Sequence, residues 1–416
     1  MKYLIVVPDG SADNALESLG GRTPLEAADT SCIDILASKG EIGSCITVPK
    51  GISPGSDSAN LSVMGYDPHK YLTGRSPLEA GSIGIEMADD DISFRANFVT
   101  LDSTGVENYD EFIMKDHAAG DITTEEAAEL VKTIEEKYGC EGFHLHCGTG
   151  YRECLIVNRS HPNGHIDYSF TPPHDILDQK TGAYLPKGLN SDFLTEMMKD
   201  SYELLKDHPV NKEREKNGLN PANSLWIWGQ GTKPALPDFN EKFGVNGAVI
   251  SAVDLIKGIG MFAGLEVLNV EGATGTADTD YEAKTAAAID AYENGKDFIY
   301  MHIEGTDECS HQGNLSGKLG CIENIDKRIV KPLYEYLKST GENFRILIIP
   351  DHRTPLAIRT HTSDSVPYVI YDSSLETPVD ESKKFTEKAA MASENHYKDG
   401  YMLAEHFFKK DTSSDK

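Results

Sequence analysis

Short apolar runs are the feature that most constrains the fold of this chain. They lie at 4–7, 225–228, 248–250, 298–303, 346–349 and 368–371. Stretches between them, such as 281–294 and 322–338, have the residue pattern of helices. Continuous apolar strands that alternate with helices are typical of a parallel sheet buried on both faces. The sequence therefore predicts an α/β fold, with a mostly parallel sheet sandwiched by helices.

The middle of the chain has a different pattern. Strand-like runs at 155–158 and 166–170 precede a polar, proline-containing stretch and a helix-like segment at 192–205. We interpret residues 98–221 as a smaller α+β domain inserted into the sheet domain. The core domain is then discontinuous and consists of 1–97 and 222–416. The chain is expected to cross between the domains near 95–98 and 218–224.

Composition excludes several classes of protein. The net charge of −28 is unfavourable for binding to nucleic acids or anionic membranes, which attract basic surfaces. No run approaches the ~18 apolar residues of a membrane helix. The seven cysteines include no CxxC pair, so neither a disulfide framework nor a zinc–thiolate site is predicted. Without a leader pattern at its start, the chain is expected to be cytoplasmic. Its oligomeric state is not indicated.

Three aspartates and three histidines follow predicted strands or lie in the loops beyond them. They are Asp9, Asp307, His311, Asp351, His352 and His361. Asp307 and His311 are four residues apart, so one helical turn would aim both at the same point. Ligands of parallel sheets bind beyond the carboxyl ends of the strands, where we expect all six side chains to converge. Mixed carboxylate and imidazole ligands favour zinc or manganese, whereas magnesium prefers oxygen.

The segment 51–61 contains two candidate nucleophiles, Ser56 and Ser58, at the start of a helical pattern. The amino end of a helix stabilises phosphate, and a bound metal can activate a serine hydroxyl. Taken alone, the pattern is better explained by a helix N-cap. Together with the metal ligands, it predicts a serine that accepts a phosphoryl group. One of the two serines is then expected to cap the helix that presents the other.

The chain resembles the archaeal-type, cofactor-independent phosphoglycerate mutases, a branch of the alkaline phosphatase superfamily. The resemblance rests on the two metal-ligand segments and on further motifs along most of the chain. These lie at 8–10, 21–28, 55–61 (GSDSANL), 65–68, 74–79, 255–260 and 272–275. It implies an alkaline-phosphatase-like core.

The resemblance also implies two divalent metals, manganese or zinc, with magnesium and cobalt as further candidates. Three side chains would bind one metal: Asp307, His311 and His361. The other would be bound by Asp9, Asp351, His352 and the serine oxygen. Alignment with the mutase motif places the nucleophile at Ser56, whereas an alkaline-phosphatase alignment selects Ser58.

Candidate substrate-binding residues follow from the chemistry of phosphoglycerate. Arg95 and Arg152 are expected to bind its carboxylate or phosphate, because the planar guanidinium matches both. Lys257 and Arg75 are further candidates for neutralising phosphate. Each of these cations could instead form a surface ion pair. Asn60 stands where many family members carry histidine, and we expect its amide to donate to the phosphate.

These residues predict a mutase that interconverts 3-phosphoglycerate and 2-phosphoglycerate through a phosphoserine, without bisphosphoglycerate. The inserted domain would bind substrate and close over the site. An alternative is a homoserine kinase-like enzyme, a function that would explain the change from histidine to Asn60. However, no GxxxxGK[ST] segment is present. A metal-dependent phosphatase or phosphonate hydrolase would use the same site without retaining the intermediate.

Overall fold

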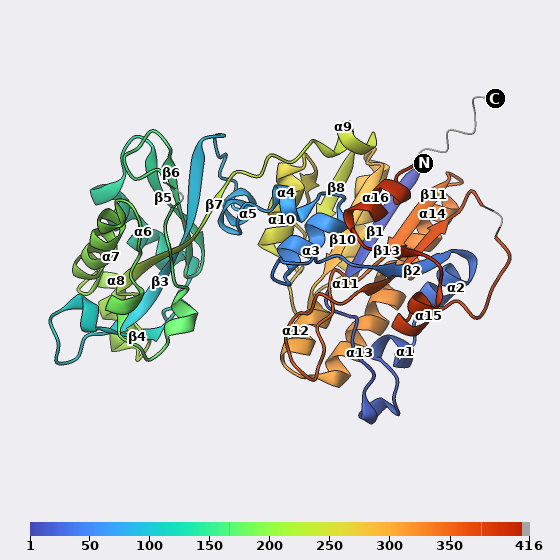
Figure 1. Cartoon of the computed structure of the whole chain (residues 1–416), viewed down its shortest axis with the longest axis horizontal. Coiled ribbons are helices and arrows are strands. Elements are labelled where there is room, and N and C mark those ends of the chain that lie inside the picture. The colour runs from blue at the N-terminus through green and yellow to red at the C-terminus, as the bar shows by residue number, and fades with distance from the viewer. Residues whose placement is uncertain (166, 376, 410–416) are drawn as a thin grey trace. The chain divides into compact units, whose positions relative to one another are not determined.

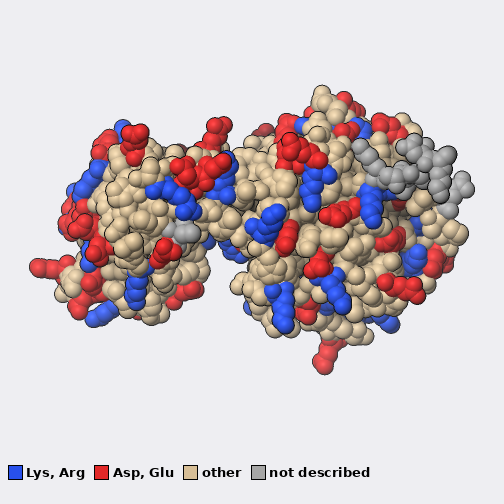
Figure 2. All heavy atoms as spheres, turned by 45° about the horizontal axis from the view of Figure 1, so that its top comes forward, with Lys and Arg blue, Asp and Glu red and all other residues tan. Residues whose placement is uncertain are grey.

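The computed structural model describes residues 1–165, 167–375 and 377–409. It divides into two compact units, which are considered separately below. Unit 1 comprises Met1–Leu72 and Ala235–Lys416, and unit 2 comprises Thr73–Pro234. No helix in the described ranges combines the length and apolarity needed to cross a bilayer. On the face drawn in Figure 2, basic and acidic side chains are interspersed.

Unit 1 contains an eight-stranded sheet in the order β13-β2-β12-β11-β1-β10-β8-β9. Its strands are β1 (Lys2–Pro8), β2 (Glu41–Cys45), β8 (Gly247–Ile250), β9 (Glu266–Val267), β10 (Phe298–Ile303), β11 (Phe344–Ile348), β12 (Val366–Asp372) and β13 (His396–Tyr397). β1 lies between β10 and β11 and is parallel to both. β12 is antiparallel to β11 and β2. The apolar residues of β1 are buried because helices cover both faces of the sheet (Figure 1).

The helices of unit 1 connect and cover these strands. They are α1 (Pro24–Ala27), α2 (Ser31–Lys39), α3 (Ser56–Val63), α4 (Pro68–Tyr71), α9 (Phe239–Phe243), α10 (Asp254–Phe262), α11 (Tyr281–Glu293), α12 (Gly305–His311), α13 (Leu315–Asn324), α14 (Lys331–Ser339), α15 (Glu387–Ala392) and α16 (Tyr401–Phe407). A π-helical turn, Ile325–Val330, joins α13 to α14. The predicted α/β class and parallel central strands are therefore confirmed.

Unit 2 is built on an antiparallel sheet. Its strands are β3 (Asp91–Asp102), β4 (Ile113–Asp116), β5 (Phe143–Thr149), β6 (Arg152–Asn158) and β7 (Ser224–Thr232). Its helices are α5 (Ser76–Ser82), α6 (Thr124–Tyr138), α7 (Ser191–Leu205) and α8 (Pro209–Lys216). Alternate β3 residues, Phe94, Ala96 and Phe98 among them, point into the core of this unit. The intervening position, Arg95, points to the other face of the sheet.

Two expectations about the middle of the chain need correction. The run 225–228 was expected to be a strand of the parallel sheet. It lies instead in β7, which pairs antiparallel with β3 in unit 2. The apolar residues of this run predict a buried strand but do not indicate whether it pairs in parallel or antiparallel. The expected crossing points near 95–98 and 218–224 both fall inside unit 2, because β3 and β7 hold these segments in one sheet. In the predicted strand 166–170, Ile166 lies outside the described residues, and Ser169 makes only an isolated bridge with Lys187.

Candidate active site

The candidate site lies where β10, β1 and β11 end. Asp9 follows β1, Asp307 is in the first turn of α12 after β10, and Asp351 follows β11. Since these strands are adjacent and parallel, their carboxyl ends meet at one edge of the sheet. The predicted metal ligands gather there into two groups, each with ligand atoms within 4.8 Å of one another.

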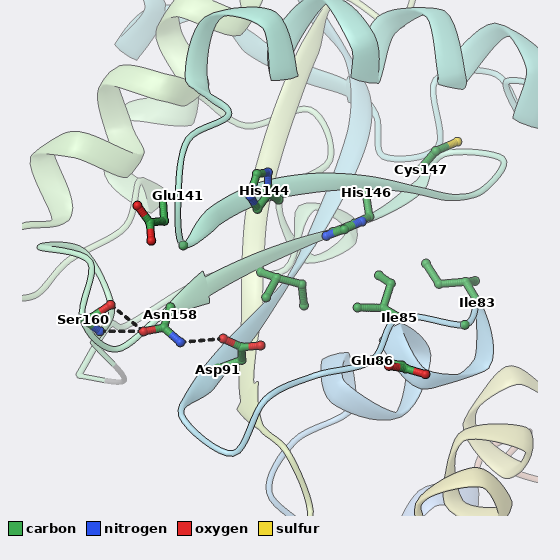
Figure 3. A pocket seen from close by; sticks show the side chains of 13 residues that line it. Ile83, Ile85, Glu86, Asp91, Glu141, His144, His146, Cys147, Asn158 and Ser160 are labelled. Carbon is green, nitrogen blue, oxygen red and sulfur yellow. Dashed lines mark hydrogen bonds between the residues drawn. The ribbon is translucent and has the colours of Figure 1, made fainter.

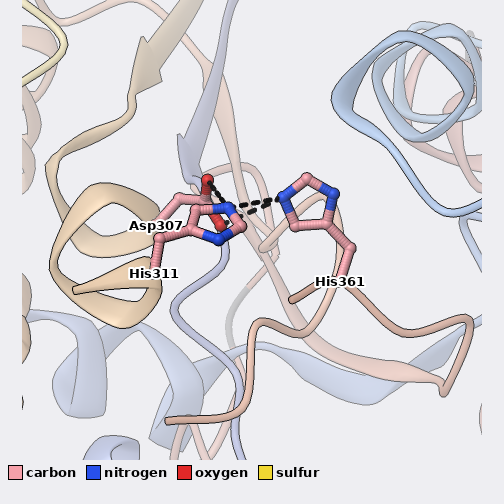
Figure 4. Close-up of side chains that lie close together, drawn as sticks. All are labelled: Asp307, His311 and His361. Carbon is pink, nitrogen blue, oxygen red and sulfur yellow. Dashed lines mark hydrogen bonds and ion pairs between the residues drawn. The ribbon is translucent and has the colours of Figure 1, made fainter. Parts of the chain in front are cut away.

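The first group consists of Asp307, His311 and His361, as Figure 4 shows. Asp307 Oδ2 is 3.0 Å from His311 Nε2, and Asp307 Oδ1 is 3.5 Å from His361 Nε2. The two imidazole Nε2 atoms are 2.9 Å apart. Burial raises the pKa of Asp307, but hydrogen bonds with both histidines outweigh it and hold the pKa below its ordinary value. Asp307 in turn raises the pKa of His311 to about 9. The group therefore favours positive charge at its centre.

The second group, Asp9, Asp351 and His352, is fully buried. His352 Nε2 lies 3.5 Å from Asp9 Oδ1 and 3.4 Å from Asp351 Oδ2. Burial, followed by the charge of Asp351, raises the pKa of Asp9 well above its ordinary value. Burial also raises the pKa of Asp351, but the neighbouring His352 helps to outweigh it and the net shift is downward.

Asp9 lacks the partners that a buried carboxylate requires. Neither of its oxygens accepts a hydrogen bond of acceptable geometry from the described residues. His302 Nε2 is 3.2 Å from Asp9 Oδ2, but the two atoms do not form a hydrogen bond. An unsatisfied buried carboxylate is costly, and a divalent cation would remove that cost. Two Asp/His groups, one with an orphaned carboxylate, are a donor set that fits transition-metal ions.

The two candidate serines differ in surroundings. Ser56 is the first residue of α3 and only half-buried, and its Oγ lies 3.3 Å from His352 Nε2. Ser58 is fully buried, and its hydroxyl donates to the carbonyl oxygen of Gly55 at 3.1 Å. The helix therefore turns Ser56 toward the second metal-ligand group and Ser58 back toward its own backbone.

Asn60 has a different role from the one expected. It is fully buried, and its Nδ2 donates to Ser56 O at 2.8 Å and to Asp351 Oδ2 at 2.9 Å. Its Oδ1 accepts a hydrogen bond from Tyr300 at 2.6 Å. Both amide hydrogens are thus committed to protein acceptors, so the expected donation to phosphate is wrong for this arrangement.

The predicted arginines lie together in unit 2. Arg95 Nε is 2.9 Å from Glu79 Oε2, and its guanidinium lies 4.1 Å from the centre of the Trp228 ring. Arg152 is exposed and lies 4.7 Å from the centre of the Tyr151 ring. Burial raises the pKa of Glu79, and the charges of Arg95, Arg152 and Arg75 oppose that shift.

Lys257 is in unit 1, on α10, where its Nζ is 3.6 Å from Asp254 Oδ1. This contact is an ion pair of the kind considered above as the alternative to phosphate binding.

A cavity of about 790 Å³ opens on unit 2 (Figure 3). Its lining includes His144 and His146.

Sequence reasoning assigned no role to several buried or partly buried groups near the two metal-ligand groups. Besides His302, they include Glu304 and Lys284, whose pKa values burial shifts to about 7 and about 8 respectively. The signal was available for His302, which is the penultimate residue of β10, the strand preceding Asp307. Tyr300 gave no signal, because a tyrosine within an apolar strand is indistinguishable from an ordinary core residue.

Comparison with known proteins identifies a consistent set of relatives. The family model for 2,3-bisphosphoglycerate-independent phosphoglycerate mutase matches residues 37–211. A mutase of that description from Methanosarcina barkeri is 43% identical over 390 residues, covering 94% of this chain and 95% of its own. A probable one from Geobacter sulfurreducens is 46% identical over 371 residues, covering 89% and 90% respectively.

Two solved structures share the fold over nearly the full length. A protein from Pyrococcus horikoshii has a TM-score of 0.78 and 29% identity, covering 98% of this chain and 96% of its own. A cofactor-independent phosphoglycerate mutase from Thermoplasma acidophilum has a TM-score of 0.66 and 28% identity, covering 97% and 98%.

Proposed function

The chain belongs to the 2,3-bisphosphoglycerate-independent phosphoglycerate mutase family, and from this membership we propose that it interconverts 3-phosphoglycerate and 2-phosphoglycerate through a phosphoserine at Ser56. The observation that carries the proposal is the position of Ser56 Oγ, 3.3 Å from His352 Nε2 in the buried Asp9–Asp351–His352 group. A half-buried hydroxyl at a helix start beside such a group suits phosphoryl transfer.

Two divalent cations complete the proposed site. Asp307, His311 and His361 would hold one, and Asp9, Asp351 and His352, with Ser56 Oγ, would hold the other. When bound, such cations lower the pKa of a serine hydroxyl and offset the negative charge of a phosphoryl group. The buried Asp9 carboxylate, which accepts no hydrogen bond from the described residues, supports this assignment.

In the proposed reaction, the phosphoryl group leaves the glycerate and returns to the same molecule. Ser56 Oγ bonds to phosphorus as the bond from phosphorus to the glycerate oxygen breaks, and the serine proton is balanced by protonation of that oxygen. The glycerate then presents its other hydroxyl, which takes the phosphoryl group back and regenerates Ser56. No nucleotide or bisphosphoglycerate is consumed.

Unit 2 is proposed to recognise the substrate. Arg95, Arg152 and Arg75 gather around one half-buried carboxylate, Glu79, which forms an ion pair with the half-buried Arg95. The planar guanidinium suits the carboxylate and phosphate groups of phosphoglycerate. Lys257 remains a weaker candidate because it already contacts Asp254. We also propose that unit 2 closes during turnover, since a phosphoserine exposed to water would be hydrolysed.

The structure gives no support to the homoserine kinase alternative. Asn60 was its only support, and the Asn60 side chain is engaged by Ser56, Asp351 and Tyr300 rather than directed at a substrate. A direct test of the proposed function is mass spectrometry of the manganese-loaded enzyme, quenched in acid during turnover of 3-phosphoglycerate. Phosphate on Ser56 is expected. A peptide that stays unmodified under turnover would contradict the intermediate.

A further inference from the structure

A chain of buried hydrogen bonds reaches the second metal-ligand group from the middle of the sheet. It starts at Tyr300, in β10, whose ring and hydroxyl are fully buried. The Tyr300 hydroxyl donates to Asn60 Oδ1 at 2.6 Å. Asn60 Nδ2 then donates to Asp351 Oδ2 and to the carbonyl oxygen of Ser56. One side chain thus connects a strand, a predicted metal ligand and the turn that carries the predicted nucleophile.

The orientation of the Asn60 amide follows from its partners. The oxygens of Asp351 and Ser56 can only accept, so the NH₂ group must face them. The carbonyl oxygen then faces Tyr300, whose hydroxyl must donate. Rotating the amide by half a turn would bring three oxygens together and leave its NH₂ group facing the tyrosine. Without the Tyr300 hydroxyl, Oδ1 would be an unsatisfied buried acceptor and the amide would lose the contact that fixes it.

The same network limits the freedom of Asp351. Its Oδ1 accepts hydrogen bonds from the backbone N–H groups of Gly10 and His352, at 3.1 Å and 2.9 Å. Its Oδ2 accepts one from Asn60 and lies 3.4 Å from His352 Nε2. Three hydrogen bonds therefore restrict the orientation of the Asp351 carboxylate within the metal-ligand group.

We infer that Tyr300 is a positioning residue that acts through Asn60 to hold Asp351 and the first turn of α3 in the geometry that binds metal. The inference rests on the proposed two-cation site and deepens it. Partners of this kind fix the orientation of a ligating carboxylate, and removing them weakens metal binding by about 10-fold to 100-fold. Among the described residues, the Tyr300 hydroxyl donates to Asn60 and not to a predicted metal ligand.

The test compares Tyr300→Phe with a matched control, Tyr292→Phe. Tyr292 is also a buried tyrosine, and its hydroxyl donates to the backbone carbonyl of Tyr3 at 2.7 Å, so its loss also costs one buried hydrogen bond. Metal-free full-length protein is titrated with Mn²⁺ by calorimetry. Tyr300→Phe is expected to weaken binding at one of two sites about tenfold, whereas Tyr292→Phe leaves both unchanged. The manganese concentration for half-maximal mutase activity should rise by the same factor.

A double-mutant cycle tests whether Tyr300 acts through Asn60. Asn60→Ala should weaken manganese binding at least as much as Tyr300→Phe. Adding Tyr300→Phe to Asn60→Ala should then weaken it no further. Additive effects, or unchanged binding in Tyr300→Phe, would overturn the inference while leaving the proposed function intact. A wild-type chain that binds no Mn²⁺ would refute the two-cation site and the inference with it.

Discussion

The hydroxyl oxygen of Ser56 lies 3.3 Å from Nε2 of His352, while the hydroxyl of Ser58, two residues on, is bonded to the carbonyl of Gly55. The two serines share a short helix but face different surroundings. This difference favours Ser56 over Ser58 as the proposed nucleophile, a choice that the motif alone left open.

Ser56→Ala is expected to reduce mutase turnover by more than about a thousandfold, because removal of a covalent nucleophile leaves only binding and charge effects. Ser58→Ala is the matched control. It should cost about 1 kcal/mol of unfolding free energy, the typical value of one buried hydrogen bond, and retain most of the turnover. Steady-state kinetics and denaturant unfolding measure both. An inactive Ser58→Ala beside an active Ser56→Ala would reverse the assignment.

Asp351→Ala is expected to lose one bound metal and most activity, because it removes both a ligand and the partner of Asn60. Chelation should inactivate the wild-type enzyme, with manganese, cobalt or zinc restoring it better than magnesium. Asp200→Ala, which breaks an exposed contact with Lys137, is the control and should keep both metals. Full activity in protein shown to be metal-free by elemental analysis would rule this account out.

Glu153 is expected to make unit 2 less stable as the pH rises. Burial raises its pKa to about 8, although a hydrogen bond from the backbone N–H of Gly148 opposes the shift, and its Oε1 has no partner among the described residues. An unfolded glutamate titrates near pH ~4.3, so the folded state holds the extra proton between these values. The unfolding free energy should therefore fall between about pH 4.3 and pH 8, by at most ~1.4 kcal/mol per pH unit from this group.

Glu153→Gln should flatten that slope relative to the wild type. Glu136→Gln, at an exposed position of α6, should leave it unchanged. The comparison is made by denaturant titration of the full chain at several pH values between about pH 5 and pH 8. Parallel slopes for wild type and Glu153→Gln would show that the carboxyl does not titrate as its burial implies.

Arg152→Lys is expected to lower kcat/KM for 3-phosphoglycerate by about 10-fold to 100-fold, because lysine cannot form the paired hydrogen bonds of a guanidinium. Arg159→Lys, at another exposed position of unit 2, preserves charge in the same way and serves as the control. Its kinetics should match those of the wild type. Equal kinetics for both variants would remove Arg152 from the substrate site.

The grouping of the candidate metal ligands could be predicted from sequence because their three aspartates lie at or just beyond strand ends. Asp9, Asp307 and Asp351 each follow a buried apolar run, and parallel strands bring such positions to one edge. The unit boundaries could not be predicted, because they depend on the antiparallel pairing of β3 with β7. These strands are far apart in the sequence, and their apolar residues do not indicate which strand each one pairs with. Asn60 was misassigned for a similar reason. Whether a buried amide faces substrate or protein depends on Tyr300, which is 240 residues away.

The most direct test is conversion of 3-phosphoglycerate by purified enzyme with manganese, without ATP or bisphosphoglycerate, with product identified by coupling to enolase. The account predicts 2-phosphoglycerate formation that depends on the metal and is lost in Ser56→Ala. A parallel reaction supplies homoserine and ATP under the same conditions. ATP-dependent formation of O-phosphohomoserine, with no turnover of 3-phosphoglycerate, would contradict the account.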